Sequence, residues 1–138
     1  MLRIAFTERW DREVHRGRPS LAAFARTGKR VLHIGCDPKA DSTRCLTSGR
    51  IPTVLETLGR SEELLAREQL VFPGAFGVSC VEAGGPQAGA GCAGLGITAM
   101  ADELNRLGIL EEPGTWWCTM SWAMWYAEGS QCPCENIL

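Results

Sequence analysis

The sequence has no long apolar run, no excess of one charge and only one tyrosine. A membrane-spanning helix needs about 20 mostly apolar residues, and no stretch of the chain provides them. No signal-peptide pattern is present, and a net charge of −2 does not predict a nucleic-acid or anionic-membrane surface. We therefore expect a cytoplasmic protein that binds neither nucleic acid nor membranes.

Cysteine, by contrast, is abundant, with seven in 138 residues. In a cytoplasmic chain, a high and odd number of cysteines favours metal or redox chemistry over a framework of disulfides. The length suffices for one modest domain with a hydrophobic core. The composition therefore predicts a small domain with metal or redox chemistry.

Strands alternate with helices in the middle of the chain. Short apolar runs predict strands at Arg30–Gly35 and Gly77–Glu82. Caps and apolar spacing predict helices over Leu21–Thr27, Pro52–Leu58, Ser61–Arg67 and Ile97–Leu104, with Ser20 and Gly108 as end signals. This alternation predicts an α/β fold in which helices cover both faces of a parallel sheet.

Two side-chain arrangements follow from these elements. His33 alternates with apolar neighbours in its strand, which is more typical of a hydrogen-bonded core histidine than of a metal ligand. Glu63 and Arg67 are four residues apart, which predicts an ion pair on the surface of the Ser61–Arg67 helix.

A glycine-rich segment, Glu82–Gly94, surrounds one cysteine, Cys92. Glycine lets backbone amides approach a bulky group and takes up positive φ at little cost. A cysteine in such a loop has N–H donors around its sulfur, as iron–sulfur ligands usually do. The alternative is an ordinary glycine-rich turn around a small buried cysteine.

A second polar segment, Gly35–Arg44, follows the first strand directly. In α/β proteins, ligand-binding loops lie at this end of a strand. The segment holds two carboxylates, a lysine and two hydroxyls, which could bind magnesium and phosphate. The alternative is a charged, solvated loop without a ligand.

Both segments resemble the nitrogenase iron protein family, which includes nitrogenase reductase and the iron–sulfur ATP-binding subunits of the dark-operative chlorophyll enzymes. Gly35–Arg44 reads G-C-D-P-K-A-D-S-T-R and matches the family's switch I at every position, and Glu82–Gly94 resembles its first cluster signature. The resemblance covers roughly Leu21 to Leu110. It implies a three-layer, parallel-sheet P-loop NTPase-like fold, incomplete in this chain, and a homodimer.

The resemblance also implies roles for single residues. Cys92 would be one of two cysteines per subunit that hold a 4Fe-4S cluster between the halves of the homodimer. Asp37, Lys39 and Asp41 would act around Mg-ATP, with Ser42 in the same cofactor-binding set. The implied activity is ATP-driven transfer of an electron, from a low-potential donor through the cluster to a catalytic partner reductase such as a nitrogenase component.

The stretch that should form the phosphate-binding P-loop departs from the family. Thr7–His15 has no glycine and no lysine, and Glu8, Asp11 and Glu13 would repel a phosphate. Permitted codons for Phe6–His15, read one base later from within Glu8, encode K-G-G-I-G-K-S-T, which is the family's P-loop. This restoration predicts a frameshift near the start of the chain.

The same relation holds near the other end. Permitted codons for Met120–Pro133, shifted by one base, encode D-V-L-G-D-V-V-C-G-G-F-A-M-P, the family's second signature with its second cluster cysteine. We therefore interpret residues 1–138 as one partial iron-protein domain, with 21–110 as the in-frame core and 6–20 and 114–138 as frameshifted. The family continues beyond this point, and we expect the chain as written to be inactive.

Alternative functions follow from the same departures. Leu95 stands where nitrogenase reductases carry an arginine that helps docking to the partner, which leaves open a nitrogenase-like component for tetrapyrrole reduction. A non-catalytic binding or regulatory remnant is an alternative of a different class. Indels in the DNA near the codons for Phe6–Glu8 and Gly114–Met120 would favour the frameshift interpretation over the remnant alternative. A P-loop partition-type ATPase without a cluster is a third alternative, and Cys92 in its loop argues against it.

Overall fold

The computed structural model describes residues 3–7, 21–36, 39–61, 63–86, 94–113 and 115–121, with the backbone alone for 3–7 and 115–121. Its five-stranded sheet has the order β1-β5-β2-β4-β3. The strands are β1 (Arg3–Thr7), β2 (Arg30–Gly35), β3 (Phe72–Pro73), β4 (Ser79–Glu82) and β5 (Thr115–Ser121).

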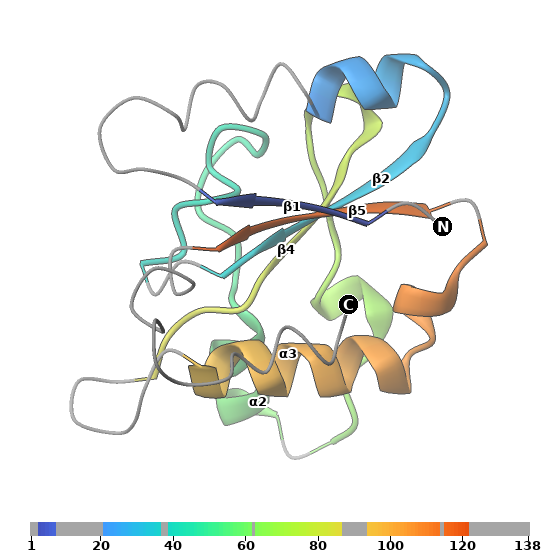
Figure 1. The fold of residues 1–138 in the computed structure, drawn as a ribbon. Helices are drawn as coiled ribbons and strands as arrows, with labels where there is room; N and C mark the ends of the chain where they lie inside the picture. Colours follow the sequence, from blue (N-terminus) through green and yellow to red (C-terminus); the bar gives the residue numbers. More distant parts are fainter. Residues whose placement is uncertain are drawn as a thin grey trace, which may run out of the picture.

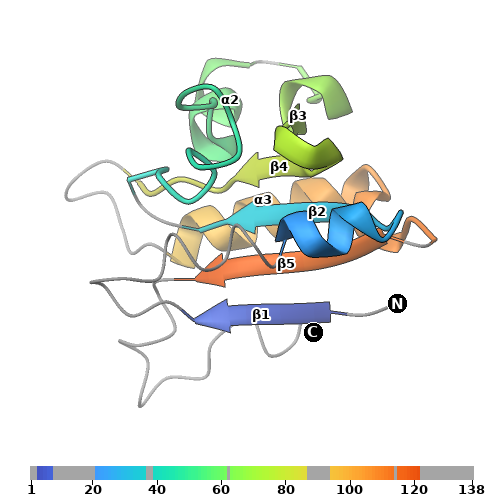
Figure 2. The ribbon, with the colours of Figure 1, turned by 90° about the horizontal axis from the view of Figure 1, so that it is seen from above.

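Four of the five strands run parallel, as the alternation of strands and helices predicts. β5 lies between β1 and β2, and β4 pairs with the other edge of β2. Figure 2 shows the arrowheads of these four strands pointing the same way. The two-residue β3 pairs with β4 in the antiparallel direction, so the sheet is mixed at this edge.

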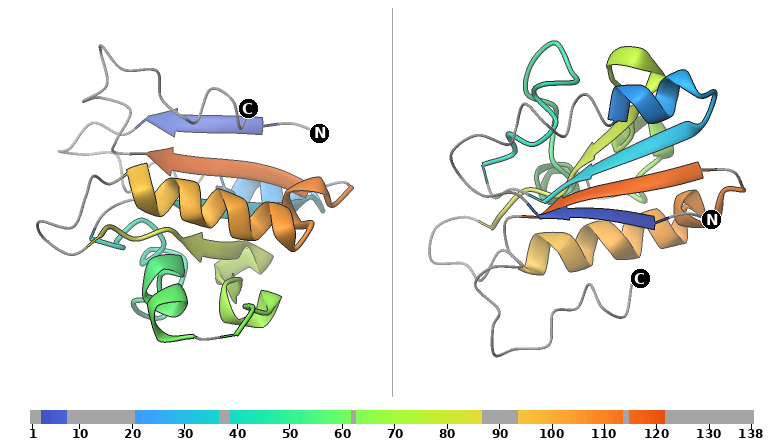
Figure 3. Two further views of the ribbon diagram at one scale, coloured as in Figure 1. Left: turned by 90° about the horizontal axis from the view of Figure 1, so that it is seen from below. Right: turned by 45° about the horizontal axis from the view of Figure 1, so that its top comes forward.

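Helices lie on both faces of the sheet, which is compatible with the predicted three-layer arrangement. α2 (Val54–Arg60) and α3 (Gly94–Arg106) lie on one face, and the helical residues 21–26 lie on the other (Figure 1). Seen from below, α3 lies over the sheet roughly along the direction of the strands, with α2 to one side of it (Figure 3, left). Three short 3-10 turns complete the structure, η1 (Arg67–Gln69), η2 (Ala75–Gly77) and η3 (Ile109–Glu111).

Alternate residues of β2 belong to two separate cores, because successive side chains of a strand point to opposite faces. Leu32 and Ile34 pack with α2 and α3, and we call this side the helical face. Val31 packs on the opposite side with Leu21 and Leu46, and we call this the loop face. All of β2 beyond its first residue is buried, as expected for a strand covered on both sides.

α3 shows the periodicity that the sequence predicts. Ile97, Met100 and Leu104 are buried on its inner side, spaced by three and four residues. Gly108 follows the helix with a φ of 66°, the left-handed conformation that glycine adopts at helix ends. The predicted helix and its end signal are therefore confirmed, with the helix starting earlier, at Gly94.

α2 begins two residues later than predicted, because Thr53 is its N-cap. The Glu56 amide donates to Thr53 Oγ1 at 3.1 Å, and the Thr53 amide donates to the Glu56 carboxylate at 3.2 Å. This reciprocal capping box satisfies two amides at the start of the helix. The predicted strand at Gly77–Glu82 likewise begins later, at Ser79, since Gly77 has a φ of 77°.

The predicted helix over Ser61–Arg67 is wrong. Ser61 ends α2 in an extended conformation, and its hydroxyl accepts a hydrogen bond from the Glu63 amide at 3.3 Å. Arg67 opens a 3-10 turn and pairs with Glu112 rather than with Glu63. A tertiary ion pair and the burial of Leu65 thus replace the local i,i+4 contact. Among the described residues, no helix is both long and apolar enough to cross a membrane.

Candidate functional site

The two polar segments of the sequence begin at the same edge of the sheet. β2 ends at Gly35 and β4 ends at Glu82, and these two residues are partners in the parallel register. The carboxyl ends of neighbouring parallel strands lie side by side, which is where α/β proteins bind ligands. The segment after β2 carries Lys39, Asp41 and Ser42, and the segment after β4 leads toward Cys92.

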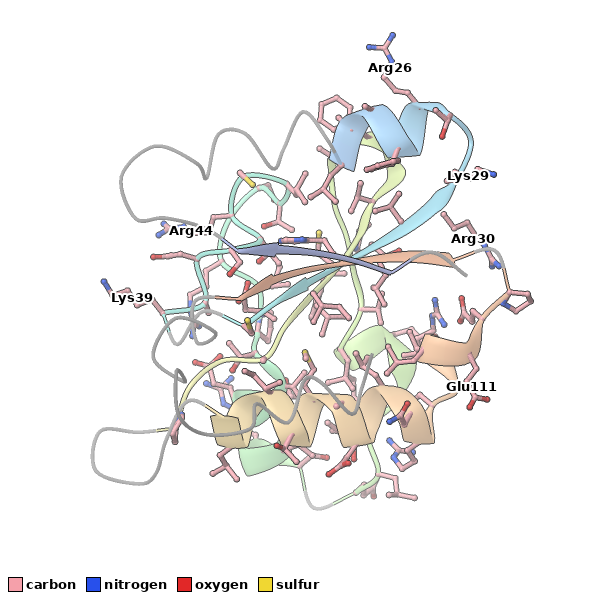
Figure 4. The ribbon with its side chains drawn as sticks, in the orientation of Figure 1. Arg26, Lys29, Arg30, Lys39, Arg44 and Glu111 are labelled. Carbon is pink, nitrogen blue, oxygen red and sulfur yellow. The ribbon has the colours of Figure 1, made fainter. Side chains whose placement is uncertain are left out.

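Three of the five predicted site residues lie in the segment 39–46, which we call the switch loop. Lys39 is exposed, and Figure 4 shows its side chain projecting from the carboxyl edge of the sheet. Asp41 is half-buried, and its carboxylate accepts a hydrogen bond from Arg44 at 2.9 Å. Ser42 is buried. The predictions for Asp37 and Cys92 fall outside the described residues.

Two buried side chains of the loop face hold the switch loop. Glu82 is fully buried, and its Oε2 atom accepts hydrogen bonds from the Thr43 amide at 3.1 Å and the Thr43 hydroxyl at 2.9 Å. One strand away, His33 Nε2–H donates to the Ser42 carbonyl at 3.2 Å. His33 is therefore a hydrogen-bonded strand residue, as its sequence pattern predicts.

Glu82 and Thr43 are functional-site candidates that the sequence analysis did not identify. A signal was present, because Glu82 is a charged residue at the end of a strand whose other residues are suited to burial. A buried carboxylate needs hydrogen-bond donors to offset the loss of water. The identity of its donor, 39 positions earlier in the chain, could not be read from the sequence.

The Glu82 carboxylate packs directly against the backbone of Gly35. A Cβ atom placed on Gly35 would overlap the carboxylate, so a larger residue there would require Glu82 to move. Ala40, in the switch loop, is fully buried and has a φ of 56°. A non-glycine residue in this region of φ is strained, and the conformation persists only where the surroundings hold it.

The start of the segment that leads to Cys92 is also tightly enclosed. Gly84 has a φ of 77°, and a Cβ atom there would lie 2.6 Å from the Thr53 side chain. On the other side, Gly96 of α3 lies against the Gly84 carbonyl so closely that a Cβ would overlap it. The Leu55 amide donates to the Ala83 carbonyl at 3.3 Å. The first turns of α2 and α3 thus clamp the backbone directly after β4.

The described cysteines do not fit an iron–sulfur cluster. Cys36 is buried in the core of the helical face, while Cys45 and Cys80 pack on the loop face. Burial raises the pKa of the Cys80 thiol to about 12, whereas a cluster ligand must be a thiolate. Within the described part of the chain, no three histidine, cysteine or acidic side chains cluster as metal ligands would. The structure therefore does not bring Cys36, Cys45 and Cys80 together as ligands of a metal.

Comparison with known proteins identifies the family. A family model described as "4Fe-4S iron sulfur cluster binding proteins, NifH/frxC family" matches residues 18–116. The nitrogenase iron protein of Methanococcus voltae is 51% identical over 92 residues, which cover 66% of this chain and 33% of that protein. That of Methanospirillum hungatei is 53% identical over 93 residues, covering 66% of this chain and 33% of the relative.

A relative with a different name is equally similar. The light-independent protochlorophyllide reductase iron-sulfur ATP-binding protein of Rubrivivax gelatinosus is 52% identical over 93 residues, covering 65% of this chain and 31% of that protein. The chain thus spans about a third of the length of the curated relatives it matches. Because the family model matches well over half of the chain, the chain belongs to the NifH/frxC family of 4Fe-4S cluster-binding proteins, which includes nitrogenase iron proteins and their protochlorophyllide reductase counterparts.

Proposed function

We propose that this chain derives from the ATP-dependent, cluster-carrying component of a two-component reductase. The intact protein would be a cytoplasmic homodimer that delivers single electrons from a low-potential donor to a catalytic partner protein. The observation that carries the proposal is the match of the 4Fe-4S family model to residues 18–116. Family membership supports the cofactor class.

The switch loop is the proposed site of response to Mg-ATP. Lys39 is exposed at the carboxyl edge, where its ammonium could approach a phosphate, and Asp37 and Asp41 would contribute carboxylate oxygens near Mg²⁺. Asp41 is paired with Arg44 in this structure, so binding a cation would require it to exchange that partner. The Ser42 hydroxyl belongs to the same proposed set.

Cys92 is the proposed cluster ligand from each subunit's glycine-rich loop. The cluster, when bound, supplies one-electron transfer. The enclosed backbone at Gly84 and the start of α3 at Gly94 would restrict the two ends of this loop. The second ligand of each subunit would be the cysteine that only the shifted frame encodes, so the chain as written lacks it.

The first test measures nucleotide binding by calorimetric titration with Mg-ATP. The chain as written should show no measurable affinity, because Glu8, Asp11 and Glu13 occupy the stretch where the family's phosphate-binding amides and lysines lie. A chain with both frames restored should bind. A micromolar dissociation constant for the chain as written would contradict the frameshift interpretation, as would genomic DNA without indels near the codons for Phe6–Glu8 and Gly114–Met120.

The second test counts iron after anaerobic reconstitution. The chain as written should retain labile, substoichiometric iron, whereas a protein with both frames restored and with the length of its relatives should hold about four irons per dimer. Cys92→Ala should abolish the cluster in that restored protein. Cys45→Ala is the matched control, because Cys45 packs against the apolar core of the loop face. Full iron content in the Cys92→Ala variant would refute the assignment.

A second candidate function is supported by Leu95. This side chain is 51% exposed in the first turn of α3, directly after the Cys92 loop. An apolar side chain at this place favours a different docking surface from that of nitrogenase reductases, and protochlorophyllide reductase subunits are among the similar proteins. Electron transfer from the restored protein to a tetrapyrrole-reducing partner, but not to a nitrogenase component, would select this candidate. Transfer to neither would favour a non-catalytic remnant.

A further inference from the structure

We propose that Cys45 of the switch loop and Cys80 of β4 are a redox pair, which a low-molecular-weight disulfide oxidises to a disulfide bond that restrains the loop. In the structure both sulfurs are thiols. The inference goes beyond the proposed function, because it involves neither nucleotide nor iron. It rests on contacts that the switch loop makes on both sides of Cys45, and on the place of both cysteines on the loop face.

The switch loop is bonded to its surroundings on both sides of Cys45. Two residues earlier, the Thr43 amide and hydroxyl donate to the Glu82 carboxylate. Glu82 and Cys80 are two residues apart in β4, so their side chains share one face of the strand. One residue after Cys45, the Leu46 carbonyl accepts a hydrogen bond from the first amide of η2 at 2.7 Å. Cys45 therefore lies between two fixed points of the loop face.

The Cys80 sulfur packs toward this part of the loop. A Cβ atom built on Gly74 would lie 2.7 Å from Cys80 Sγ and 3.4 Å from Leu46 Cβ. The sulfur and the switch loop thus pack against the same glycine. Cys80 belongs to the apolar core of the loop face, and Cys45 packs against that core. The two cysteines are therefore held in one small region on this side of the sheet.

The Cys45 sulfur approaches the same region from the loop. Its thiol donates to the Ser42 carbonyl, with 3.7 Å between Sγ and the oxygen. The same oxygen accepts the hydrogen bond from His33 Nε2 at 3.2 Å. His33 is the partner of Cys80 in the parallel register of β2 and β4. Through this carbonyl and this register, both cysteines adjoin one histidine.

The environments of the two sulfurs set the order in which they react. Cys45 is half-buried, whereas Cys80 is fully buried. The pKa of the Cys80 thiol is raised to about 12, by burial first and by the nearby Cys45 second. The thiolate is the nucleophile in thiol–disulfide exchange, and the external disulfide must reach it. Cys45 therefore reacts with the external disulfide first.

The oxidation takes two exchange steps. The Cys45 thiol loses its proton, and its sulfur attacks one sulfur of the external disulfide, which forms a mixed disulfide and releases one thiol that takes up the proton. Cys80 then loses its proton and attacks Cys45 Sγ, which releases the second thiol. The two protein thiols lose two electrons in total, and one external disulfide is reduced to two thiols. Excess external thiol reverses both steps.

Disulfide mapping in the chain as written tests the pair. The chain is incubated with glutathione disulfide without oxygen and quenched with acid, and its remaining thiols are blocked with N-ethylmaleimide. Trypsin and a glutamate-specific protease then release Cys45 in peptide 45–50 and Cys80 in peptide 69–82, and neither peptide contains another cysteine. The two linked peptides should be at least about tenfold more abundant from the folded chain than from the chain in guanidinium, because the fold holds the sulfurs close.

Three variants test the order of attack. Cys80→Ala should stop after the first step and accumulate the mixed disulfide at Cys45. Cys45→Ser should leave Cys80 reduced, because the external disulfide does not reach a fully buried sulfur. Cys36→Ala is the matched control, because Cys36 is also buried but belongs to the core of the helical face. It should leave the yield of the link unchanged.

Hydrogen exchange tests whether the bond restrains the switch loop. The amides of Arg44, Leu46 and Thr47 donate to carbonyl groups within the turn 41–47. Their exchange should slow by about tenfold or more in the oxidised chain, because a cross-link limits opening of the turn. Reduction with dithiothreitol should restore the original rates. The Cys45→Ser variant, treated in the same way, should show no change.

Three results would overturn the proposal. Equal yields of the link from the folded and the denatured chain would mean that the fold does not hold the two sulfurs together. Preferential pairing of Cys45 with another cysteine would mean that Cys80 is not its partner. A Cys45–Cys80 link that left amide exchange in the turn unchanged would mean that the bond does not restrain the switch loop.

Discussion

The two faces of the sheet use the same strands for different purposes. On the helical face, Leu32 and Ile34 pack against Met100 and Leu104 of α3 in an apolar core. On the loop face, the alternate position His33 and the strand-end residue Glu82 bond to a polar loop. The helical face gains free energy from burying apolar surface, which needs little directionality. The loop face has a second apolar core, around Leu21, Val31 and Leu46, and in addition a few directional bonds that hold the switch loop.

This difference indicates which face should mainly determine the stability of the fold and which should respond to a ligand. A tightly packed apolar core transmits force but has no second arrangement of similar free energy. In the switch loop, the positive φ of Ala40 is held by neighbouring contacts such as the hydrogen bonds at Thr43, so we expect loss of those bonds to let the loop relax. The comparison predicts that substitutions on the helical face change mainly the free energy of unfolding, and that those on the loop face also change the position of the switch loop.

The largest expected effect is on the helical face. Leu104→Ala should lower the free energy of unfolding by about 2–5 kcal/mol, because Leu104 is fully buried between α3 and the sheet and truncation leaves a cavity. Urea denaturation followed by circular dichroism measures this loss. Leu64→Ala is the control, because Leu64 is 81% exposed and should change stability by less than about 0.5 kcal/mol. If both variants lost the same free energy of unfolding, burial on the helical face would not explain the effect of Leu104→Ala.

A smaller effect is expected where the loop face is most crowded. Gly35→Ala should cost about 1–3 kcal/mol, because the added methyl group overlaps the Glu82 carboxylate. Gly59→Ala is the matched control in α2, where a Cβ meets nothing within 4 Å. The control should stabilise the helix by up to about 1 kcal/mol. If Gly35→Ala left the free energy of unfolding unchanged, the Glu82 carboxylate would be able to move. This result would weaken the comparison of the two faces.

The N-terminus of α2, which packs against Gly84 after β4, should contribute less. Thr53→Ala removes the side chain that caps the Glu56 amide and should cost about 1 kcal/mol. Thr98→Ala removes an exposed hydroxyl inside α3 that donates to the Gly94 carbonyl, and it should cost less than about 0.5 kcal/mol. Thermal unfolding of both variants, measured side by side, tests whether capping accounts for the difference.

The smallest effect concerns pH. The hydrogen bond from Arg50, with that from the Thr53 amide, lowers the pKa of Glu56 below its ordinary value. A carboxyl group with a lowered pKa stabilises the fold above its ordinary pKa, and this contribution is lost as the pH falls through the lower, folded value. Because the pair is exposed to solvent and screened, the contribution should stay below about 1 kcal/mol.

Glu56→Gln is the variant that isolates this contribution. Its deficit in stability relative to wild type should be present at neutral pH and should shrink toward zero in acid, below the ordinary pKa of glutamate. Added salt should reduce the deficit at neutral pH, since it screens the attraction between Arg50 and Glu56. A deficit that persists unchanged in acid would assign the effect to the capping bond rather than to charge.

Local chemistry in the sequence was enough to predict β2, β4, the helical residues near 21–26 and α3. Apolar periodicity, a glycine at the end of α3 and the alternation of elements act over a few residues, so they can be read along the chain. The family, and with it the cofactor class, could also be predicted from the strings around Asp41 and Cys92, because each combines several residue types in a fixed order.

The tertiary structure alone decided which residues hold the site. The bonds of Thr43 to Glu82 and of Arg67 to Glu112 join positions far apart in the chain, and the second of them displaced the local pairing of Glu63 with Arg67 that the sequence predicted. The insertion of β5 between β1 and β2 is equally non-local. Periodicity determines which face of an element is buried, but the partner of a buried polar group depends on how the whole chain closes around it, and no short stretch of sequence contains that information.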